Sequence, residues 1–381
     1  MIKKIILLFL AWRLLLFIPI LAANQLISYR EGYAYTSINY FLEKSQSMLS
    51  NFLVSPWGNF DGVYYLLIAE NGYTVNPGFF PLFPILINLA SSVFGVTIEF
   101  DSIQYFIALF LVSLFFLCAL IMFYKLAKLD YKKNIAMWGI VFILVFPTSF
   151  FFAAIYSESL FLLLSILSFY FARKKNWLMA SIFGMLLTVT RPVGIAIFPA
   201  ILYEFYISEK SFLKKKALLL LAIPLGLIAY AIYNLVKWGN ALYFIQAQGN
   251  FQNNREVGGI VLFPQTIFRY LKIFFTVSPG QYEWFVALLE FSAFIFASVM
   301  IYIAWQKKVR FSYVIFAIIA LLIPISTGTF SGLPRYVLIL FPIFIALALV
   351  KNKFLKLVYA VISIILLFLL LMLFSKGYFV A

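Results

Sequence analysis

Apolar runs of about 20 residues, the length that crosses the hydrocarbon core of a bilayer as a helix, recur along nearly the whole of this 381-residue chain. Hydrophobic residues make up 65% of the chain and charged residues 11%. A soluble domain is about half apolar and about a quarter charged. No polar stretch is long enough for a separate soluble domain. We therefore predict a single all-α polytopic membrane domain over residues 1–381.

About eleven spans fit the hydropathy pattern. They cover roughly residues 5–27, 104–126, 134–152, 156–172, 177–190, 193–208, 217–237, 284–305, 311–327, 334–350 and 355–374. Segment 79–98 is ambiguous, because Phe79-Phe80-Pro81-Leu82-Phe83-Pro84 opens a run that fits either a span or an interfacial helix.

The basic residues favour one topology. If 79–98 does not cross and 177–208 is a hairpin, six basic clusters fall on one side, which the positive-inside rule makes cytoplasmic. These clusters lie within residues 3–4, 125–133, 173–175, 210–216, 307–310 and 351–356. The N-terminus is then inside and the C-terminus outside, and two large loops, 28–103 and 238–283, face outward. We expect short interfacial helices in the first loop.

The residue inventory excludes several chemistries. Histidine is absent, which excludes histidine acid–base catalysis, Ser-His-Asp or Cys-His catalysis and imidazole metal sites. The one cysteine, Cys118, allows no intrachain disulfide. The net charge of +16 follows topology rather than one basic face, so we predict no nucleic-acid partner. Any chemistry must use carboxylates, Tyr, Lys or Arg.

Four uncommon charges converge on the predicted outer face. Asp61 follows Asn59-Phe60 in the first loop, and Glu158 lies in a short connection between two spans. Arg191 marks the tip of the 177–208 hairpin, and Arg335 begins a later span. Ionisable groups at membrane depth are unfavourable and by default indicate function.

Each charge also has a structural interpretation. Asp61 could cap an interfacial helix over about residues 63–70, a position that favours Asp. Glu158 could complement the positive end of its helix, with Ser157 as the cap.

The two arginines differ in this respect. Arg191 could extend to lipid headgroups. Arg335 at a helix N-terminus opposes the macrodipole, which is unfavourable unless an anion lies there. Helix N–H groups and a guanidinium together form a phosphate site.

These groups suit transfer of a sugar from a lipid phosphate. The departing phosphate needs cations, which Arg335 and Arg191 supply, and the acceptor hydroxyl needs a base, which Asp61 supplies. No Gly-rich nucleotide loop is present. No cofactor is certain: a divalent metal shared by two carboxylates is compatible with the sequence, but no ligand spacing requires one.

Several motifs resemble the PIG-V type, the GPI mannosyltransferase 2 family. They are Phe60-Asp61-Gly62, Ile68-Ala69-Glu70-Asn71-Gly72-Tyr73, Phe79 to Pro84, Ala153 to Phe161, Thr190 to Gly194 and Leu333-Pro334-Arg335-Tyr336. The arginine motifs are similar to those of the family's prokaryotic relatives.

The resemblance implies a GT-C glycosyltransferase fold, a polyprenyl-phosphate sugar donor, typically of mannose, and inversion at the anomeric carbon. By position, Asp61 matches the catalytic loop aspartate and Glu158 the second acidic motif. Phe60 replaces a common Trp, so an aromatic wall remains while donor fit is in question.

The leading hypothesis is a membrane hexosyltransferase, with mannose as the expected sugar, whose active site is extracytoplasmic. Asp61 and Glu158 are its predicted catalytic residues, and the predicted substrate-binding residues are Tyr65, Tyr156 and Ser157. The acceptor is a lipid, a glycan or a protein. A transporter or flippase for lipid-linked saccharides is the alternative; it would show inverted repeats and broken helices. A non-catalytic assembly subunit is a third possibility.

Overall fold

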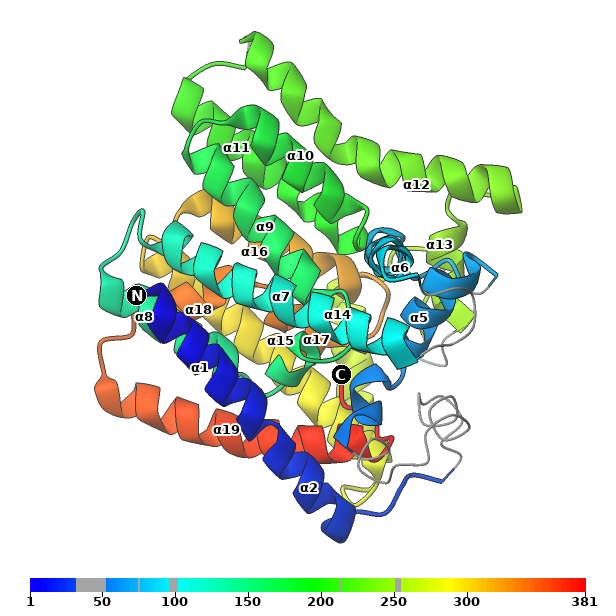
Figure 1. The fold of residues 1–381 in the computed structure, drawn as a ribbon. Helices are drawn as coiled ribbons and strands as arrows, with labels where there is room; N and C mark the ends of the chain where they lie inside the picture. Colours follow the sequence, from blue (N-terminus) through cyan, green and yellow to red (C-terminus); the bar gives the residue numbers. More distant parts are fainter. Residues whose placement is uncertain (32–52, 75, 96–101, 213, 251–254) are drawn as a thin grey trace. The chain divides into compact units, whose positions relative to one another are not determined.

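The computed structural model describes residues 1–31, 53–74, 76–95, 102–212, 214–250 and 255–381, and every regular element in these ranges is a helix (Figure 1). The chain forms two compact units. Unit 1 comprises 1–163 with 350–380, and unit 2 comprises 164–349 with Ala381. Parts of both predicted outer loops, at 32–52, 75, 96–101 and 251–254, lie outside the described residues.

Unit 1 contains the predicted spans 5–27, 104–126, 134–152 and 355–374 and the first part of 156–172. Its helices are α1 (Ile2–Leu15), α2 (Phe17–Leu26), η1 (Ser55–Gly58), α5 (Asp61–Asn71), α6 (Leu82–Val93), α7 (Ser102–Ala127), α8 (Lys133–Val145), η2 (Ser149–Phe152), the first part of α9 (Glu158–Arg173) and α19 (Lys353–Ser375). Helix α19 packs against α2 and α8, and α5 packs against α6.

Unit 2 contains the remaining helices. After the end of α9 come α10 (Trp177–Thr188), η3 (Pro192–Ala196), α11 (Ile197–Glu209), η4 (Lys215–Leu221), α12 (Ala222–Trp238), α13 (Tyr243–Gln246), η5 (Ala247–Asn250), α14 (Phe263–Thr276), α15 (Tyr282–Gln306), α16 (Phe311–Ile325), α17 (Leu333–Leu338) and α18 (Phe341–Ala348). All eight residues of α18 are buried, and the helix packs against α15 and α16, so it forms the centre of this unit.

Helices α10 and α12 pack closely because a glycine faces the contact. A Cβ atom at Gly226 would lie 2.3 Å from the Thr188 hydroxyl oxygen and 2.4 Å from the Met185 carbonyl oxygen. The Thr188 hydroxyl donates across the same contact to the Ile223 carbonyl at 3.0 Å. Figure 1 shows the two helices side by side.

Each of the eleven predicted spans contains a helix or a pair of helices, and the protein is an integral multi-pass membrane protein. Five segments in the described part are long and apolar enough to cross a bilayer: Ile2–Leu26, Ile103–Ala127, Lys215–Trp238, Tyr282–Gln306 and Lys353–Ser375. The other six predicted spans correspond to shorter helices, so the number eleven stays a prediction. In the described part of segment 79–98, residues 79–95, the one helix is the 12-residue α6, which is too short to span about 30 Å of hydrocarbon.

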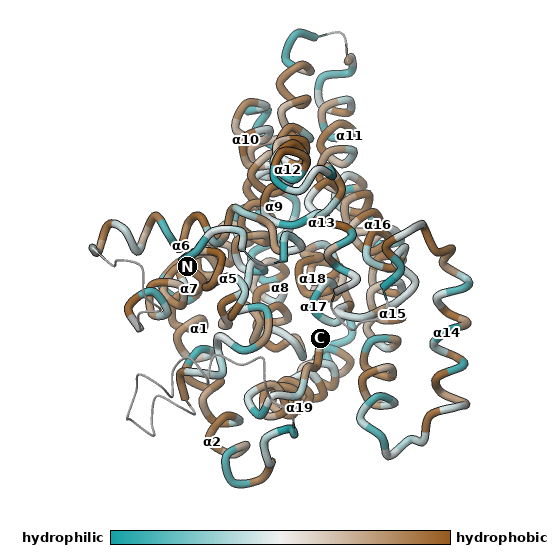
Figure 2. The backbone as a smooth tube through the Cα atoms, turned by 90° about the vertical axis from the view of Figure 1, so that its right-hand side faces the viewer, coloured by the Kyte–Doolittle hydropathy of each residue, from teal (hydrophilic) through white to brown (hydrophobic). Residues whose placement is uncertain are grey.

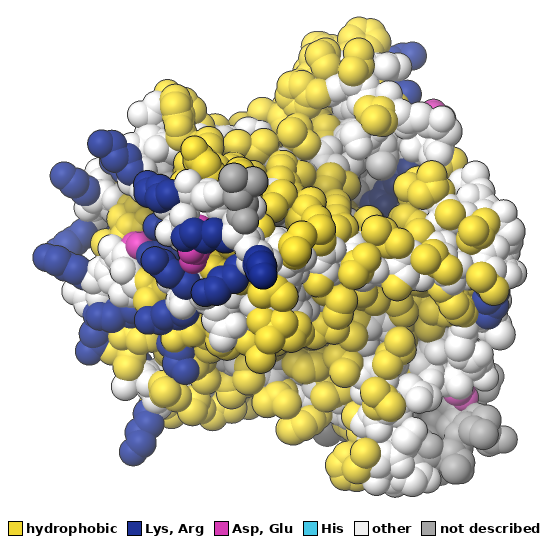
Figure 3. All heavy atoms as spheres, turned by 90° about the horizontal axis from the view of Figure 1, so that it is seen from above, with side chains coloured by type: hydrophobic (Ala, Val, Ile, Leu, Met, Phe, Trp, Pro, Cys, Tyr) yellow, Lys and Arg dark blue, Asp and Glu magenta, His cyan; other side chains and the backbone are white. Residues whose placement is uncertain are grey.

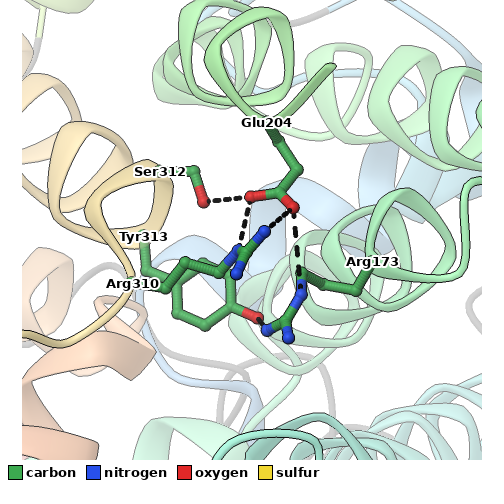
Figure 4. A network of polar contacts seen from close by, with 5 residues as sticks. All are labelled: Arg173, Glu204, Arg310, Ser312 and Tyr313. Carbon is green, nitrogen blue, oxygen red and sulfur yellow. Dashed lines mark hydrogen bonds and ion pairs between the residues drawn. The ribbon is translucent and has the colours of Figure 1, made fainter. Parts of the chain in front are cut away.

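A buried charge network joins three helices of unit 2 (Figure 4). Glu204 of α11 is fully buried and accepts two bonds from Arg310, at 2.7 and 2.5 Å. Ser312 donates to the same carboxylate at 2.7 Å, and Arg173 lies 3.8 Å away. Arg173 also donates to the Tyr313 hydroxyl at 3.0 Å. A buried carboxylate requires such partners, and here they connect the end of α9 and the start of α16 to α11.

Hydrophobic side chains cover much of the face drawn in Figure 3, as lipid contact requires. Helix α14 differs from this pattern. Figure 2 shows polar and apolar residues alternating along it. Its Phe268 and Phe275 are exposed, whereas Thr266 and Tyr270 are buried against the rest of unit 2.

Candidate active site

Asp61 lies at a strained turn in unit 1. It is the first residue of α5, and the preceding residue, Phe60, has φ 57° and ψ −112°. A non-glycine residue at positive φ costs about 1–3 kcal/mol, and such residues concentrate at functional sites. The Phe60 ring packs on Phe374 and Phe379, with ring centroids 5.5 and 5.1 Å apart, and this packing stabilises the turn.

The structure does not support the alternative role of Asp61 as the N-cap of a helix over residues 63–70. The N-cap position belongs to Phe60, with no side-chain cap bond, and α5 begins at residue 61 rather than 63. Asp61 is half-buried in the first turn, where the helix dipole favours a negative charge. Asp61 is therefore not the N-cap residue.

The two acidic motifs meet in unit 1 through backbone contacts. The Asp61 N–H donates to the Tyr156 hydroxyl at 3.3 Å, and that hydroxyl donates to the Asn59 carbonyl at 2.9 Å. The Ile155 N–H donates to the Trp57 carbonyl at 2.7 Å. A Cβ at Gly62 would lie 3.4 Å from the Ile155 carbonyl oxygen, so the two motifs are also in van der Waals contact here.

One turn further along α5, a side-chain bond joins the same two segments. The hydroxyl groups of Tyr65 and Ser157 lie 2.9 Å apart, and both residues are buried. Ser157 precedes Glu158, the first residue of α9, whose side chain is only 1% exposed. The structure thus brings together five of the predicted site residues. We call Asp61, Tyr65, Tyr156, Ser157 and Glu158 the acidic region.

Arg13 supports this region, a role that the sequence analysis missed. Its guanidinium donates to the Ala153 carbonyl at 2.9 Å and lies 4.5 Å from the centre of the Trp57 ring. Ala153 leads into the second acidic motif and Trp57 into the first. A cation inside an apolar run was the available signal, because such residues usually have a defined partner.

The two predicted phosphate-binding arginines lie together in unit 2. Arg335 is in α17 and Arg191 precedes η3, and both are at least nine-tenths buried. The Arg191 guanidinium lies 4.7 Å from the centre of the Tyr336 ring. Arg191, Arg335 and also Arg255 act electrostatically on the Tyr336 hydroxyl. We call Arg191, Arg255 and Arg335 around Tyr336 the arginine cluster.

Arg255 is the member that the sequence analysis missed. Its guanidinium donates to Gln248 at 2.7 Å and to the Ser331 carbonyl at 3.1 Å. It comes from the second predicted outer loop, where a polar setting makes one arginine unremarkable. Only folding shows that it joins residues 60 to 80 positions away in sequence.

A tight turn fixes Arg191. A Cβ atom at Gly194 would lie only 2.4 Å from the Leu187 carbonyl oxygen, so only glycine fits there. The Gly194 N–H donates to the Arg191 carbonyl at 2.9 Å. The predicted hairpin is present as α10 and α11, with Arg191 in its connection.

Chemically, the acidic region offers a half-buried carboxylate beside hydroxyl groups, which suits proton abstraction and sugar binding. The arginine cluster offers three cations, which suits an anion such as a phosphate. Among the residues that the structure describes, no three Cys, Asp or Glu side chains gather as metal ligands.

Comparison with known proteins identifies the family. The family described as "Mannosyltransferase (PIG-V)" matches residues 2–205, more than half of the chain. The chain belongs to this mannosyltransferase family. The match includes Asp61, Glu158 and Arg191, and it ends before Arg255 and Arg335. No curated protein matches the chain.

Several solved structures are also similar. The oligosaccharyltransferase of Archaeoglobus fulgidus, in complex with Zn and sulfate, has 16% identity and a TM-score of 0.48, covering 85% of this chain and 49% of that one. The same protein tethered to an acceptor peptide has 15% identity and a TM-score of 0.47, covering 85% and 51%. The chain thus spans about half the length of these proteins. The GT-C fold expected from the motifs stays a prediction.

Proposed function

We propose that this PIG-V family member transfers mannose from a polyprenyl-phosphate donor to an acceptor hydroxyl on the extracytoplasmic side of the membrane. Asp61 acts as the general base on the acceptor. The phosphate leaves as an anion bound by Arg335 and Arg191. Glu158 orients sugar hydroxyls, together with Tyr65, Tyr156 and Ser157. The acceptor is a lipid, a glycan or a protein.

The meeting of the two acidic motifs carries the proposal. The bond from the Asp61 N–H to Tyr156 and the bond between Tyr65 and Ser157 hold these motifs side by side. The strained turn at Phe60 stands directly before the carboxylate. A strained turn directly before a carboxylate, in a region that also holds hydrogen-bonded hydroxyl groups, is more typical of a reaction centre than of a helix cap.

The arginine cluster supports the donor class. Three guanidinium groups around one phenol repel each other, and a bound anion would offset this repulsion. Arginine also binds phosphate in a bidentate manner, which orients the leaving group.

The test is a transfer assay with purified protein in lipid nanodiscs. Radiolabelled mannosyl-phosphoryl-polyprenol is supplied with a membrane extract as the source of acceptors, and products are separated and identified by mass spectrometry. We expect labelled product with the wild-type protein and a loss of about 10²- to 10⁴-fold with Asp61→Asn, as for removal of a general base. Undiminished transfer by Asp61→Asn would refute the base assignment.

A further inference from the structure

The segment that precedes α17 is held by side chains from distant elements of unit 2. The Gly328 carbonyl accepts from Arg269 at 3.1 Å, and the Ser331 carbonyl accepts from Arg255 at 3.1 Å. Between them, the Phe330 N–H donates to the Tyr270 hydroxyl at 2.9 Å. We call residues 328–332 the α17 loop.

Tyr270 and Glu290 form the buried centre of these contacts. The Tyr270 hydroxyl donates to the Glu290 carboxylate and lies 3.2 Å from the Thr329 hydroxyl. Glu290 is 5% exposed, and the nearby backbone of Gly332 favours the charged form of its carboxylate. Burial and the nearby Glu290 carboxylate raise the pKa of Tyr270, so its hydroxyl stays protonated and remains a donor.

Gly332 connects this pair to the arginine cluster. Its carbonyl accepts the N–H groups of both Arg335 and Tyr336, each at 3.1 Å, and so forms the first turn of α17. Gly332 has φ 79°, which favours glycine, so the loop has one defined entry into the helix. Arg255 interacts electrostatically with Glu290 and bonds Ser331 directly.

We infer that Tyr270 and Glu290 are positioning residues for the donor phosphate: they hold the α17 loop so that Arg335 and Arg255 face the same anion. A buried carboxylate in a membrane-spanning helix is unfavourable unless it serves a defined purpose. Here that purpose is to fix backbone rather than to react. The inference rests on the proposed phosphate site and names residues that the catalytic proposal does not use.

The test measures binding of polyprenyl phosphate, which carries the lipid and the phosphate without the sugar, so that no transfer is needed. Tyr270→Phe keeps the ring and removes the hydroxyl, and Glu290→Gln keeps the shape and removes the charge. We expect each to weaken binding about tenfold, as for loss of a hydrogen bond to a charged group. Tyr302→Phe and Glu283→Gln are the matched controls, because both residues are exposed on α15, the helix that carries Glu290. Both control variants should bind polyprenyl phosphate with wild-type affinity.

Amide hydrogen exchange supplies a readout that does not depend on the ligand. In Tyr270→Phe, exchange in the peptide covering 326–336 should accelerate, while peptides in α10 and α19 should exchange as in the wild type. Wild-type affinity in both Tyr270→Phe and Glu290→Gln would overturn the inference, as would unchanged exchange of the α17 loop. If the wild-type protein does not bind polyprenyl phosphate, the phosphate site fails and the positioning role fails with it. If binding follows the prediction but no transfer occurs, only the catalytic assignment fails.

Discussion

The acidic region and the arginine cluster are built in different ways. The acidic region is a meeting of two short motifs, joined by bonds that use backbone groups and hydroxyls. The arginine cluster collects its cations from three separate segments, each held by its own turn or loop. A single carboxylate in a fixed frame suits proton transfer, whereas several convergent cations suit binding. This difference predicts that substitutions in the acidic region lower kcat, whereas substitutions in the arginine cluster raise the KM for the donor.

The largest effect is expected from Asp61→Asn. In steady state we expect kcat to fall about 10²- to 10⁴-fold, with a donor KM within about threefold of the wild type, because the base acts in the transition state. Radiometric transfer at varied donor concentration measures both constants. Glu70→Gln, at the other end of the same helix, is the control and should keep wild-type kinetics. If Asp61→Asn raised the donor KM and left kcat unchanged, the two regions would not differ in function as proposed.

The next effect is expected from Arg335→Ala. Loss of a charged hydrogen bond to phosphate should raise the donor KM about tenfold to a hundredfold, with a smaller change in kcat. Arg335→Lys should recover only part of this loss, because an ammonium cannot bind a phosphate in a bidentate manner. Donor titrations of both variants supply the measurement. Wild-type kcat and donor KM in Arg335→Ala would contradict the proposed role of the arginine cluster in donor binding.

We expect Glu204→Gln to lower the stability of the protein without changing its binding of the donor. This substitution leaves the guanidinium groups of Arg310 and Arg173 without their buried carboxylate, and we expect a loss of about 3–5 kcal/mol in the free energy of unfolding. Thermal unfolding in nanodiscs measures the loss, and donor KM of the folded protein should not change. Glu209→Gln is the control on the same helix, because Glu209 bonds a surface lysine, Lys214, and should affect stability less. An altered donor KM would show that paired and clustered arginines do not differ in function.

The smallest effect is expected from Phe60→Trp, which restores the residue common in the family. The aromatic contacts with Phe374 and Phe379 should persist, so we expect donor KM to change by only about twofold to threefold. Donor titration measures it, and Phe106→Trp on the exposed side of α7 is the control. A large loss of kcat would mean that the geometry of this turn is tuned to phenylalanine.

The positions of most helices and of the two acidic motifs could be predicted from short stretches of the sequence. Hydropathy located the helices, and the charge pattern favoured a hairpin at 177–208, which the structure contains as α10 and α11. Asp61 and Glu158 could be predicted as site residues because each lies in a compact motif, and this assignment stays a prediction. Several of the shorter helices were overestimated in length; α8, for example, ends at Val145, just before Phe146-Pro147, whereas its predicted span reached residue 152.

Contacts between distant residues were not predictable. Arg13 bonds Ala153 across 140 positions, and Tyr270 meets Phe330 across 60. Hydropathy and motif spacing describe neighbours along the chain, so neither can assign such partners. The bond of Arg255 to Ser331 and the bond of Tyr270 to Glu290 are likewise visible only in the folded structure.

Single-turnover transfer by Asp61→Asn tests the central claim most directly. The variant is loaded with saturating mannosyl-phosphoryl-polyprenol, acceptor is added, and release of polyprenyl phosphate is followed over time. The account predicts that the variant binds the donor as the wild type does and releases polyprenyl phosphate at least about a hundredfold more slowly. Release at the wild-type rate would contradict it, because proton abstraction by Asp61 would then have no part in the reaction.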